Sequence, residues 1–385
     1  MGIILVMKNR VEIIIIGAGA SGLFLGSLLD KKSYLILDHN PKIGSKLLIS
    51  GGGKCNVTNG LIKPKNYLGD QRFVRHIIKR FDQYRLLQWL QDRGVFPEVR
   101  KNDQYFCQNS ASEIVDLFAN EISSSSIKLN THVKRVIKQE EFFEVHTSKG
   151  VWQSRYVVVA TGGISFPKLG ATPIGYEIAQ SFGHTIVPLR AGLVGLTLQP
   201  EEFFFKQLSG ISTEVTITIG EKVCRGSLLF AHKGITGPAV LDASLYWERG
   251  KITIDFLPHL NLKSLHQSKK KISNILGLPS RLSRAFLAHL SIEDRMANQL
   301  SNSEWERLSL LKNYTFAPAG TFGYAKAEVT KGGVSTEEID ASSMMSKKAE
   351  NLYFLGEVLD VTGELGGYNL QWAFSTAFVC AKAIE

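Results

Sequence analysis

The sequence predicts an α/β protein in which a parallel-sheet domain is interrupted by an inserted segment. Three observations support this prediction. An apolar, β-branched run at 13–16 is followed at once by a glycine-rich turn and an apolar helical pattern. From about residue 193 the pattern changes to short alternating strands, and from about 260 to 312 it becomes helical. A further apolar strand at 352–355 then returns the chain to the first domain.

With 385 residues, the chain is longer than a single core usually serves, so we expect two or three domains. The strand-like stretches "STEVTITIG", "KVCRGSLLF" and "KITIDFLP" favour an inserted β-barrel-like or sandwich domain. The expected boundaries are 1–190 plus 336–385 for the main domain, 191–258 plus 313–335 for the β-rich domain, and 259–312 for a small helical domain.

The stretch "VEIIIIGAGASGLFLGSLL" predicts a buried strand, a glycine turn and a helix. Gly17 permits a tight turn, Gly19 lets the backbone approach a pyrophosphate, and Gly22 allows close helix-to-strand packing. The start of the helix presents N–H groups to the phosphates. A second strand, "SYLILDHN", ends in an acid about 20 residues on, where a carboxylate can bind ribose hydroxyls. The predicted Rossmann-like dinucleotide site comprises Gly17, Gly19, Ala20, Ser21, Gly22 and Asp38.

The dinucleotide that the sequence favours is FAD, because only one such fingerprint is present. Val133 lies in a predicted strand where flavoproteins commonly place a backbone contact to the adenine. One apolar strand ends in "ATGG". The strand at 352–355 leads into an acid, a glycine-rich loop and a helix, as in many flavoproteins. The alternative for this C-terminal segment is a simple strand–helix unit with no role in binding. The further predicted contacts are Val133, Thr161, Gly162, Gly163, Gly356, Glu357, Gly366, Gly367, Asn369 and Leu370.

A triple glycine stands in "LLISGGGKCNVTNG", residues 47–60. Backbone N–H groups in such a turn reach a phosphate or a ring edge with no Cβ in the way. Because the first fingerprint already supplies the pyrophosphate site, we expect this loop to wrap the flavin half of FAD. Lys46 and Lys54 can balance phosphate or flavin charge, with solvent exposure as the alternative. The predicted contacts are Lys46, Ser50, Gly51, Gly52 and Gly53.

Cys55 and Asn56 follow this loop and are expected where a substrate meets the flavin ring. Cys55 has two interpretations. It is either a small buried residue that lines the site, or a proton donor to the carbon next to the one that receives hydride. The sequence leaves both open.

The composition indicates which partners, metal sites and location to expect. The net charge of +10 favours an anionic partner, although a solvated basic surface explains it equally well. No cysteine pair has metal-ligand or disulfide-framework spacing, so we expect no metal site, reduced thiols and a cytoplasmic location. The N-terminal apolar run is short, which argues against a signal peptide and a membrane span, and Met7 is a candidate native start.

Seven segments together resemble the YhiN/BaiN-type flavoproteins, also described as aminoacetone oxidase-like or NAD(P)/FAD-dependent oxidoreductases. They are "GAGASG", "GSKLLISGGGKCNVTN", "ATGG", "GYEIAQSFGHTI", "LLFAHKGITGPAVL", "AEVTKGGV" and "GEVLDVTGELGGYNLQWAFS", and they span nearly the whole chain in the family's order. The resemblance implies a two-part FAD domain, of the two-dinucleotide-binding-domain type, interrupted by an insertion. Pro173 and Ile174 depart from the glycine and acid of many members, which leaves the role of any family acid there in doubt.

Two regions concentrate positive charge. One is "FVRHIIKRFDQYRLLQWLQDRG", in which Tyr84 and Trp89 are interleaved with bases, and the other is the inserted helical segment with Lys269–Lys271, Arg281 and Arg284. Solvated faces of amphipathic helices are one interpretation. The other is a surface that contacts RNA phosphates, with aromatic rings available to stack on bases.

The resemblance implies an FAD-dependent oxidoreductase that saturates a carbon–carbon double bond with electrons from NAD(P)H as a transient donor. One resembling group makes dihydrouridine in large-subunit ribosomal RNA, and another acts in bile-acid reduction. The basic charge and the inserted helices favour an RNA substrate. The alternatives are an oxidase or reductase of a small metabolite, aminoacetone- or bile-acid-like, and a non-catalytic protein that binds flavin or RNA.

Overall fold

The computed structural model describes residues 9–29 and 32–384, so the candidate start at Met7 lies outside the described residues. The chain divides into two compact units. Unit 1 consists of Met1–Arg190 and Val329–Glu385, and unit 2 is Ala191–Glu328. The sequence assigned 313–335 to the inserted region, whereas the structure places residues 329–335 with unit 1.

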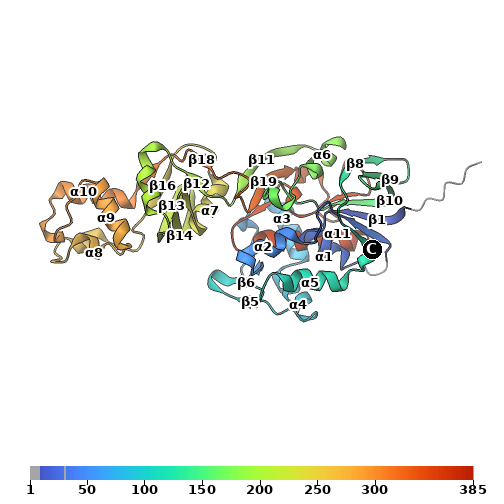
Figure 1. Ribbon diagram of the computed structural model, residues 1–385, viewed down its shortest axis with the longest axis horizontal. Coiled ribbons are helices and arrows are strands. Elements are labelled where there is room, and N and C mark those ends of the chain that lie inside the picture. Colours follow the sequence, from blue (N-terminus) through green and yellow to red (C-terminus); the bar gives the residue numbers. More distant parts are fainter. Residues whose placement is uncertain (1–8, 30–31, 385) are drawn as a thin grey trace, which may run out of the picture. The chain divides into compact units, whose positions relative to one another are not determined.

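Unit 1 is built on a mixed sheet with the strand order β7-β2-β1-β10-β9-β8, and β20 also pairs with β10 (Figure 1). The pairs β7–β2, β2–β1, β1–β10 and β10–β20 are parallel, and β10–β9 and β9–β8 are antiparallel. Residues Ile13–Ile16 of β1 are almost fully buried, as expected for a strand covered on both faces. The strands are β1 (Arg10–Ile16), β2 (Tyr34–Leu37), β7 (Ile127–Lys128), β8 (Val133–Lys138), β9 (Phe143–Thr147), β10 (Gly150–Val159) and β20 (Leu352–Phe354).

Helix α11, which closes the chain, lies beside α1 in the core of unit 1, and the two appear together in red and blue in Figure 1. The helices of this unit are α1 (Ala20–Gly26), α2 (Ser45–Gly53), α3 (Gln71–Arg80), α4 (Gln83–Gln91), α5 (Ser112–Glu121), α6 (Ile174–Ser181) and α11 (Tyr368–Ile384). Shorter pairings are formed by β3 (Asn56–Asn59), β5 (Glu98–Val99) and β6 (Gln104–Phe106), by β4 (Tyr67–Leu68) with β21 (Thr362–Gly363), and by β11 (Ile186–Gly192) with β19 (Val329–Val334).

Helix α3 shows why the first basic region folds as it does. Asp70 caps the helix by accepting the N–H groups of Arg72 and Phe73. The apolar side chains of α3 are buried, and its basic side chains are exposed. In the next helix, Trp89 packs edge-on against Phe24. One of the two aromatic residues considered for base stacking is therefore part of the core.

Unit 2 contains a seven-stranded antiparallel sheet with the order β17-β16-β13-β14-β15-β12-β18. The order has two ends, so among the described residues the backbone pairing forms an open sheet, whereas the sequence left a barrel-like and a sandwich arrangement open. The strands are β12 (Leu196–Thr197), β13 (Ser212–Ile219), β14 (Lys222–Ala231), β15 (Gly234–Thr236), β16 (Ile252–Asp255), β17 (Tyr314–Phe316) and β18 (Gly320–Thr321).

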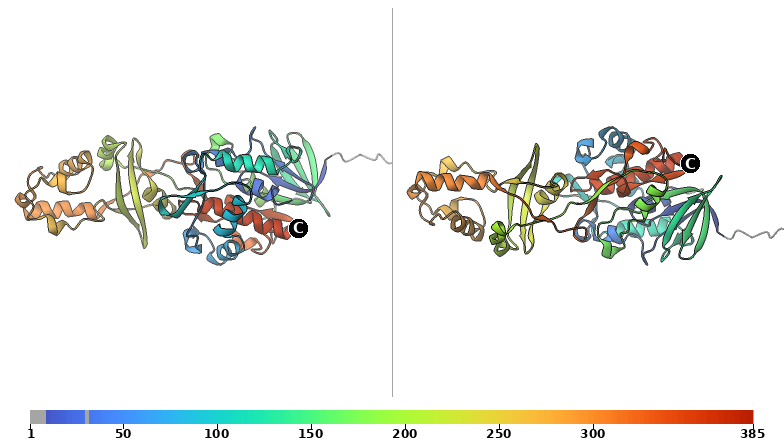
Figure 2. Two further views of the ribbon diagram at one scale, coloured as in Figure 1. Left: turned by 90° about the horizontal axis from the view of Figure 1, so that it is seen from below. Right: turned by 90° about the horizontal axis from the view of Figure 1, so that it is seen from above.

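The helices of unit 2 are α7 (Pro238–Tyr246), α8 (Ile272–Ile275), α9 (Ser280–His289) and α10 (Asn302–Ser309). Helix α7 packs on β13 and β14. The other three lie on one side of the sheet, and in Figure 2 they are orange while the sheet is yellow-green. Strands and helices share one apolar cluster, in which Phe205, Phe256 and Phe286 have no more than 1% of their surface exposed. The strands and the helices that the sequence assigned to two separate domains therefore share one hydrophobic core.

A polar cluster, in which His184 is buried, Glu338 is partly buried and Thr185 and Lys348 are exposed, joins the end of α6 to the turn that follows β19. His184 Nδ1 lies 3.2 Å from Glu338 Oε2, and Lys348 Nζ lies 2.7 Å from Glu338 Oε1. Thr185 donates its N–H and its hydroxyl to the same carboxylate. Burial alone would raise the pKa of Glu338, but the hydrogen bonds from Lys348 and Thr185 outweigh it and lower the pKa from 4.5 to about 2.

We expect Glu338→Gln to destabilise the protein by about 2 kcal/mol at pH 7, because the carboxylate is more stable in the folded than in the unfolded chain. Since the folded-state pKa is depressed, this contribution is present above pH 4.5 and is lost as the pH falls towards 2. Urea midpoints at pH 7, 5, 4 and 3 should therefore converge for the two proteins as the pH falls. Glu337→Gln, at the exposed neighbouring position, is the control and should follow wild type. A constant gap across this pH range would contradict the assignment.

Within residues 9–29 and 32–384, no helix is both long and apolar enough to cross a membrane. In the same residues no group of three or more His, Cys, Asp or Glu side chains is placed to hold a metal ion.

Candidate functional site

The glycines of the first turn differ in what surrounds them. Gly17 has φ +111°, and a Cβ there would lie 2.4 Å from the carbonyl oxygen of Ala160. A Cβ on Gly22 would lie 2.0 Å from the oxygen of Gly17. Around Gly19, by contrast, no heavy atom would lie within 4 Å of a Cβ. The fold thus requires two of these glycines, while the third borders open space in which a ligand can approach the backbone.

Asp38, which follows the second strand, hydrogen-bonds to the backbone of this turn. Its Oδ2 accepts the N–H of Ala18 at 2.7 Å, and its Oδ1 accepts the N–H of Asn40 at 2.7 Å. The backbone N–H of Thr131 bonds to the carbonyl of Asp38, which brings the start of β8 at Val133 to the same end of the site. Each carboxylate oxygen keeps a further lone pair for a ribose hydroxyl.

The opening residues of α1 meet the C-terminal strand. Ser21 is buried, and a Cβ on Gly356 would lie 2.2 Å from Ser21 Oγ. Ala20 is half-buried beside it. A Cβ on Gly17 would also lie 3.1 Å from the Cα of Thr161. The first turn, the "ATGG" segment and the end of β20 therefore form one cluster.

The triple glycine adopts a left-handed backbone. α2 is regular only in its first turns, because Ser50 has an extended ψ of 146° and Gly51, Gly52 and Gly53 have φ of 55°, 67° and 83°. A Cβ on Gly51 would lie 2.9 Å from the N of Asn56 and from a ring carbon of Phe106, whereas Gly52 has no neighbour within 4 Å. Gly51 and Gly52 are exposed. The loop therefore exposes its backbone at Gly51 and Gly52.

Cys55 lies directly under this loop with no exposed surface. Its φ of 48° is left-handed, which is uncommon for a residue with a Cβ. Cys107, also fully buried, hydrogen-bonds through its thiol to Cys55 and thereby lowers the pKa of Cys55, although burial acts in the opposite direction. The same contact, together with burial, raises the pKa of Cys107. The backbone N–H of Cys107 donates to the carbonyls of Lys54 and Cys55 at 3.0 and 3.3 Å.

Asn56 and its strand β3 lie against the glycine loop before α11. The amide of Asn56 is satisfied when its oxygen accepts the N–H of Gly367 at 3.1 Å. Asn59 donates to the carbonyl of Gly366 at 3.1 Å. A Cβ on Gly367 would lie 2.4 Å from the backbone of Thr58. β3 and the C-terminal loop are thus in direct contact.

The same loop is closed by the first turn of α11. Asn369 accepts the N–H of Gly363 and donates to its carbonyl, both at 2.9 Å. Leu370 is partly buried against the core of unit 1. These contacts fix the start of α11 next to β3.

Lys46 and Glu357 form an ion pair, with Nζ 2.7 Å from Oε2. Glu357 Oε1 accepts the N–H of Thr330 at 2.8 Å, and a Cβ on Gly163 would lie 2.9 Å from the same oxygen. Gly162 has φ +70°, with only Glu357 within 4 Å of a Cβ. Lys46 therefore lies beside a carboxylate in this structure, whereas the sequence suggested phosphate or flavin charge as its counterpart. Lys54, in contrast, donates to the carbonyl of Asn109.

The first turn, the triple-glycine loop with β3, the "ATGG" segment and the C-terminal loop thus contact one another, and Val133 is linked to them through Asp38. Sequence reasoning missed Thr330, which also accepts the N–H groups of Ile164 and Ser165. Its only signal was its place in the "AEVTKGGV" segment. It also missed Cys107, which is 52 positions from Cys55 and carries no local pattern.

These surroundings fit a bound FAD. The open space at Gly19 and Gly52 suits a close approach of phosphates and of a flat ring to the backbone. The side chains of Leu48 and Ile49, beside the triple glycine, are 37% and 43% exposed, which suits an apolar ring. Nε2 of His39, next to Asp38, is buried and has no hydrogen-bond partner among the described residues, which suits a polar ligand atom at the adenine end.

We expect Lys46→Met to raise the dissociation constant of FAD about five- to tenfold, because Glu357 loses the cation that orients it. The effect on stability should be less than about 1 kcal/mol, since the pair is partly exposed. Lys46→Arg keeps the cation and serves as the control. The measurement is the fluorescence change on titrating the apoprotein with FAD. Equal affinities for all three proteins would contradict an orienting role for Lys46.

Comparison with known proteins gives a family match over nearly the whole chain. The family described as "HI0933-like protein Rossmann domain" matches residues 11–383.

Three curated proteins are similar over almost their full length. The chain is 39% identical to a ribosomal RNA dihydrouridine synthase of Haemophilus influenzae, covering 98% of this chain and 100% of that protein. It is 38% identical to a ribosomal RNA dihydrouridine synthase of Escherichia coli K12, covering 97% and 98%. It is 29% identical to a 3-dehydro-bile acid delta(4,6)-reductase of Clostridium scindens, again covering 97% and 98%.

Proposed function

We propose that this protein, which belongs to the HI0933-like family of Rossmann-domain proteins, reduces the C5–C6 double bond of a uridine in large-subunit ribosomal RNA. The protein is an FAD-dependent oxidoreductase. The observation that carries the proposed substrate is the identity of 38–39% over nearly the full length to two ribosomal RNA dihydrouridine synthases. The residues that meet at the candidate site come from the segments that carry the resemblance to the YhiN/BaiN-type flavoproteins.

Saturating this bond requires a hydride at one carbon and a proton at the other. FAD, when bound and reduced by NAD(P)H, supplies the hydride. The chain holds the cofactor through the first turn, Asp38 and Val133, the triple-glycine loop with Lys46 and Ser50, the "ATGG" segment with Glu357, and the loop from Gly366 to Leu370. We assign no separate nicotinamide domain, because the sequence carries one dinucleotide fingerprint.

We assign the proton to the thiol of Cys55, with Asn56 next to it as the residue that orients the substrate. The hydrogen bond from Cys107 lowers the pKa of Cys55, which favours release of a proton to the substrate carbon. Cys55 has no exposed surface, so this role requires the substrate to enter beside the exposed backbone of Gly51 and Gly52. The alternative role, lining of the flavin site, requires no such approach.

The test of the substrate is the nucleoside content of ribosomal RNA from cells with and without the protein. We expect dihydrouridine in large-subunit RNA of the wild type, none at that site in the deletion strain, and its return on complementation. An unchanged nucleoside map would overturn the proposed substrate. An RNA substrate within the ribosome implies a cytoplasmic location.

A second candidate is reduction of a small unsaturated metabolite. The 29% identity to a bile-acid reductase over the full length favours it, because that protein's name describes reduction of a conjugated system. Rapid reoxidation of the reduced enzyme by a steroid enone, with no reoxidation by ribosomal RNA, would favour this candidate. Rapid turnover with oxygen and release of peroxide would instead indicate an oxidase.

A further inference from the structure

Unit 2 contains a segment, residues 256–292, that has no acidic residue. At the composition of the whole chain, about three acids would be expected there. The segment carries six basic residues, and all six are exposed: Lys263, Lys269, Lys270, Lys271, Arg281 and Arg284. We call it the basic segment.

The cations just outside the basic segment behave differently. Arg295 lies 3.1 Å from Glu293 and 2.6 Å from Glu304, and Lys312 lies 3.2 Å from Asp255. Among the described residues, no carboxylate lies within ion-pair distance of the six cations of the basic segment. Arg281 does donate to the backbone carbonyl of Gln207, a contact that leaves its charge uncompensated. The surface therefore carries unpaired positive charge, which attracts a polyanion.

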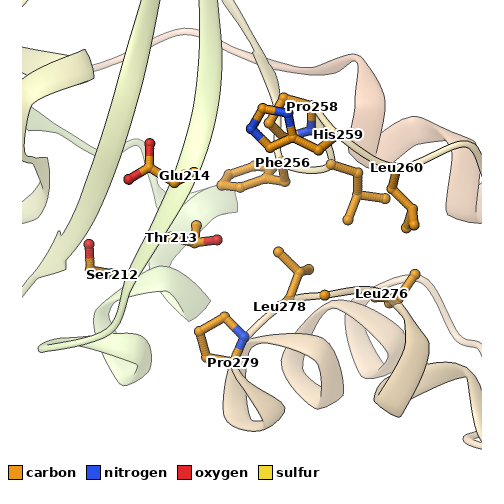
Figure 3. Close-up of a pocket in the computed structure, with 12 residues that line it drawn as sticks. Ser212, Thr213, Glu214, Phe256, Pro258, His259, Leu260, Leu276, Leu278 and Pro279 are labelled. Carbon is orange, nitrogen blue, oxygen red and sulfur yellow. The ribbon is translucent and has the colours of Figure 1, made fainter.

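A cleft of about 460 Å³ opens between the basic segment and strand β13. Figure 3 shows Phe256, Leu260 and Leu278 directing their side chains into this space, with Thr213 across from them. His259 stands at the rim with its ring exposed. The volume is within the range of small-ligand sites, and the apolar walls suit a flat ring rather than a phosphate.

The polar groups of the cleft also favour a base. Ser212, Thr213 and Glu214 of β13 line its other side. A carboxylate repels a phosphate but accepts a hydrogen bond from the amino group of a nucleobase. An imidazole ring can stack on a base. Cations outside the cleft and apolar and acceptor groups within it match the alternation of phosphate and base along a single strand of RNA.

We propose that the basic segment and this cleft form a docking surface for single-stranded RNA, in which the cations contact phosphates and the cleft receives one unpaired base. This inference rests on the proposed RNA substrate. It concerns a base held away from the one that is reduced, and it locates the determinant of RNA binding in unit 2.

The first test uses the full-length protein loaded with FAD and an unstructured RNA oligonucleotide of about 12 nucleotides. Replacing Lys269, Lys270 and Lys271 with Gln should weaken binding about tenfold or more, and the slope of log affinity against log salt should become shallower by about 2, because three phosphate contacts are lost. The matched control replaces Lys222, Lys233 and Lys251, which are exposed in unit 2 outside the basic segment, with Gln. Equal affinity and equal slope for the two triple variants would overturn the proposal.

The second test separates the cleft from the cations. His259→Ala should weaken RNA binding about fivefold with an unchanged salt slope, because a base contact rather than a phosphate contact is lost. His232→Ala, also exposed in unit 2, is the control. In all variants the rate of flavin reduction by NAD(P)H should equal that of wild type, which confirms folded enzyme. If His259→Ala binds RNA as tightly as the control variant, the cleft is not part of the docking surface.

Failure of this inference can be told from failure of the proposed function. If the wild type forms dihydrouridine but the lysine variants bind RNA like the control, the docking surface is wrong and the function stands. If the wild type binds RNA through the basic segment but forms no dihydrouridine, the docking surface stands and the function is wrong. If the wild type does not bind the oligonucleotide, the docking surface is wrong, and the nucleoside map decides the function by itself.

Discussion

Cys55→Ala is expected to slow reoxidation of the reduced enzyme by its substrate by about a hundredfold or more, while FAD stays bound and NAD(P)H still reduces it. A positioned general acid contributes about 10²- to 10⁴-fold to such a step. Reduction of the flavin needs no proton from this thiol, so only the second half-reaction should change. Stopped-flow absorbance of the flavin, measured separately for each half-reaction, checks this result.

The pH profile of the same half-reaction provides a sharper test. An acid must be protonated to act, so the rate should fall as the pH rises through the pKa of Cys55. Cys107→Ala removes the hydrogen bond that lowers this pKa, and the fall should therefore move to higher pH. Cys107→Ser keeps a donor and should lie closer to wild type.

Cys224→Ala, at a buried cysteine in unit 2, is the control for loss of a buried thiol. It should leave the rate and the pH profile unchanged. Full activity of Cys55→Ala would end the case for Cys55 as the acid and would leave it as a residue that lines the site.

Two glycines of the first turn should respond to alanine in opposite ways. Gly22→Ala should destabilise the apoprotein by about 3 kcal/mol, because the new Cβ would lie 2.0 Å from the backbone oxygen of Gly17. Gly19→Ala should leave the apoprotein unchanged, since its φ of −91° suits alanine and no heavy atom lies within 4 Å of the Cβ. In this variant the dissociation constant of FAD should rise at least about tenfold, because the methyl group occupies the space for the pyrophosphate.

Thermal midpoints of the apoprotein and fluorescence titration with FAD together distinguish these effects. Wild-type FAD affinity in Gly19→Ala would mean that the open space at this turn does not hold the phosphates. Wild-type stability in Gly22→Ala would mean that helix α1 can shift away from β1, contrary to the close packing of the two.

The elements whose signal is local were predictable from sequence. The buried run at 13–16, the glycines that follow it and the acid at 38 each depend on neighbours within one strand–turn–helix unit, and the structure has that unit. The strands at 212–219, 222–231 and 252–255 and the helices at 280–289 and 302–309 also overlap the stretches whose periodicity predicted them, with ends that extend at most one residue beyond.

The contacts that complete the candidate site are long-range, and no periodicity encodes them. Lys46 meets Glu357, and Asn59 meets Gly366, across about 300 positions of sequence, because the chain leaves unit 1 after β11 and returns through β19. The pairing of Cys55 with Cys107 likewise depends on β3 lying beside β6.

A glycine turn, a thiol and a C-terminal strand–helix unit could be assigned to a Rossmann-like flavoprotein from the residues alone, because the chemistry of each lies in a short segment. The folded chain was needed to show that the thiol is buried beside a second thiol, that Lys46 faces a carboxylate, and that a cleft adjoins the basic segment of unit 2. Burial, ion pairing and clefts arise between segments that are distant in the chain, so they depend on how the elements pack and not on local pattern.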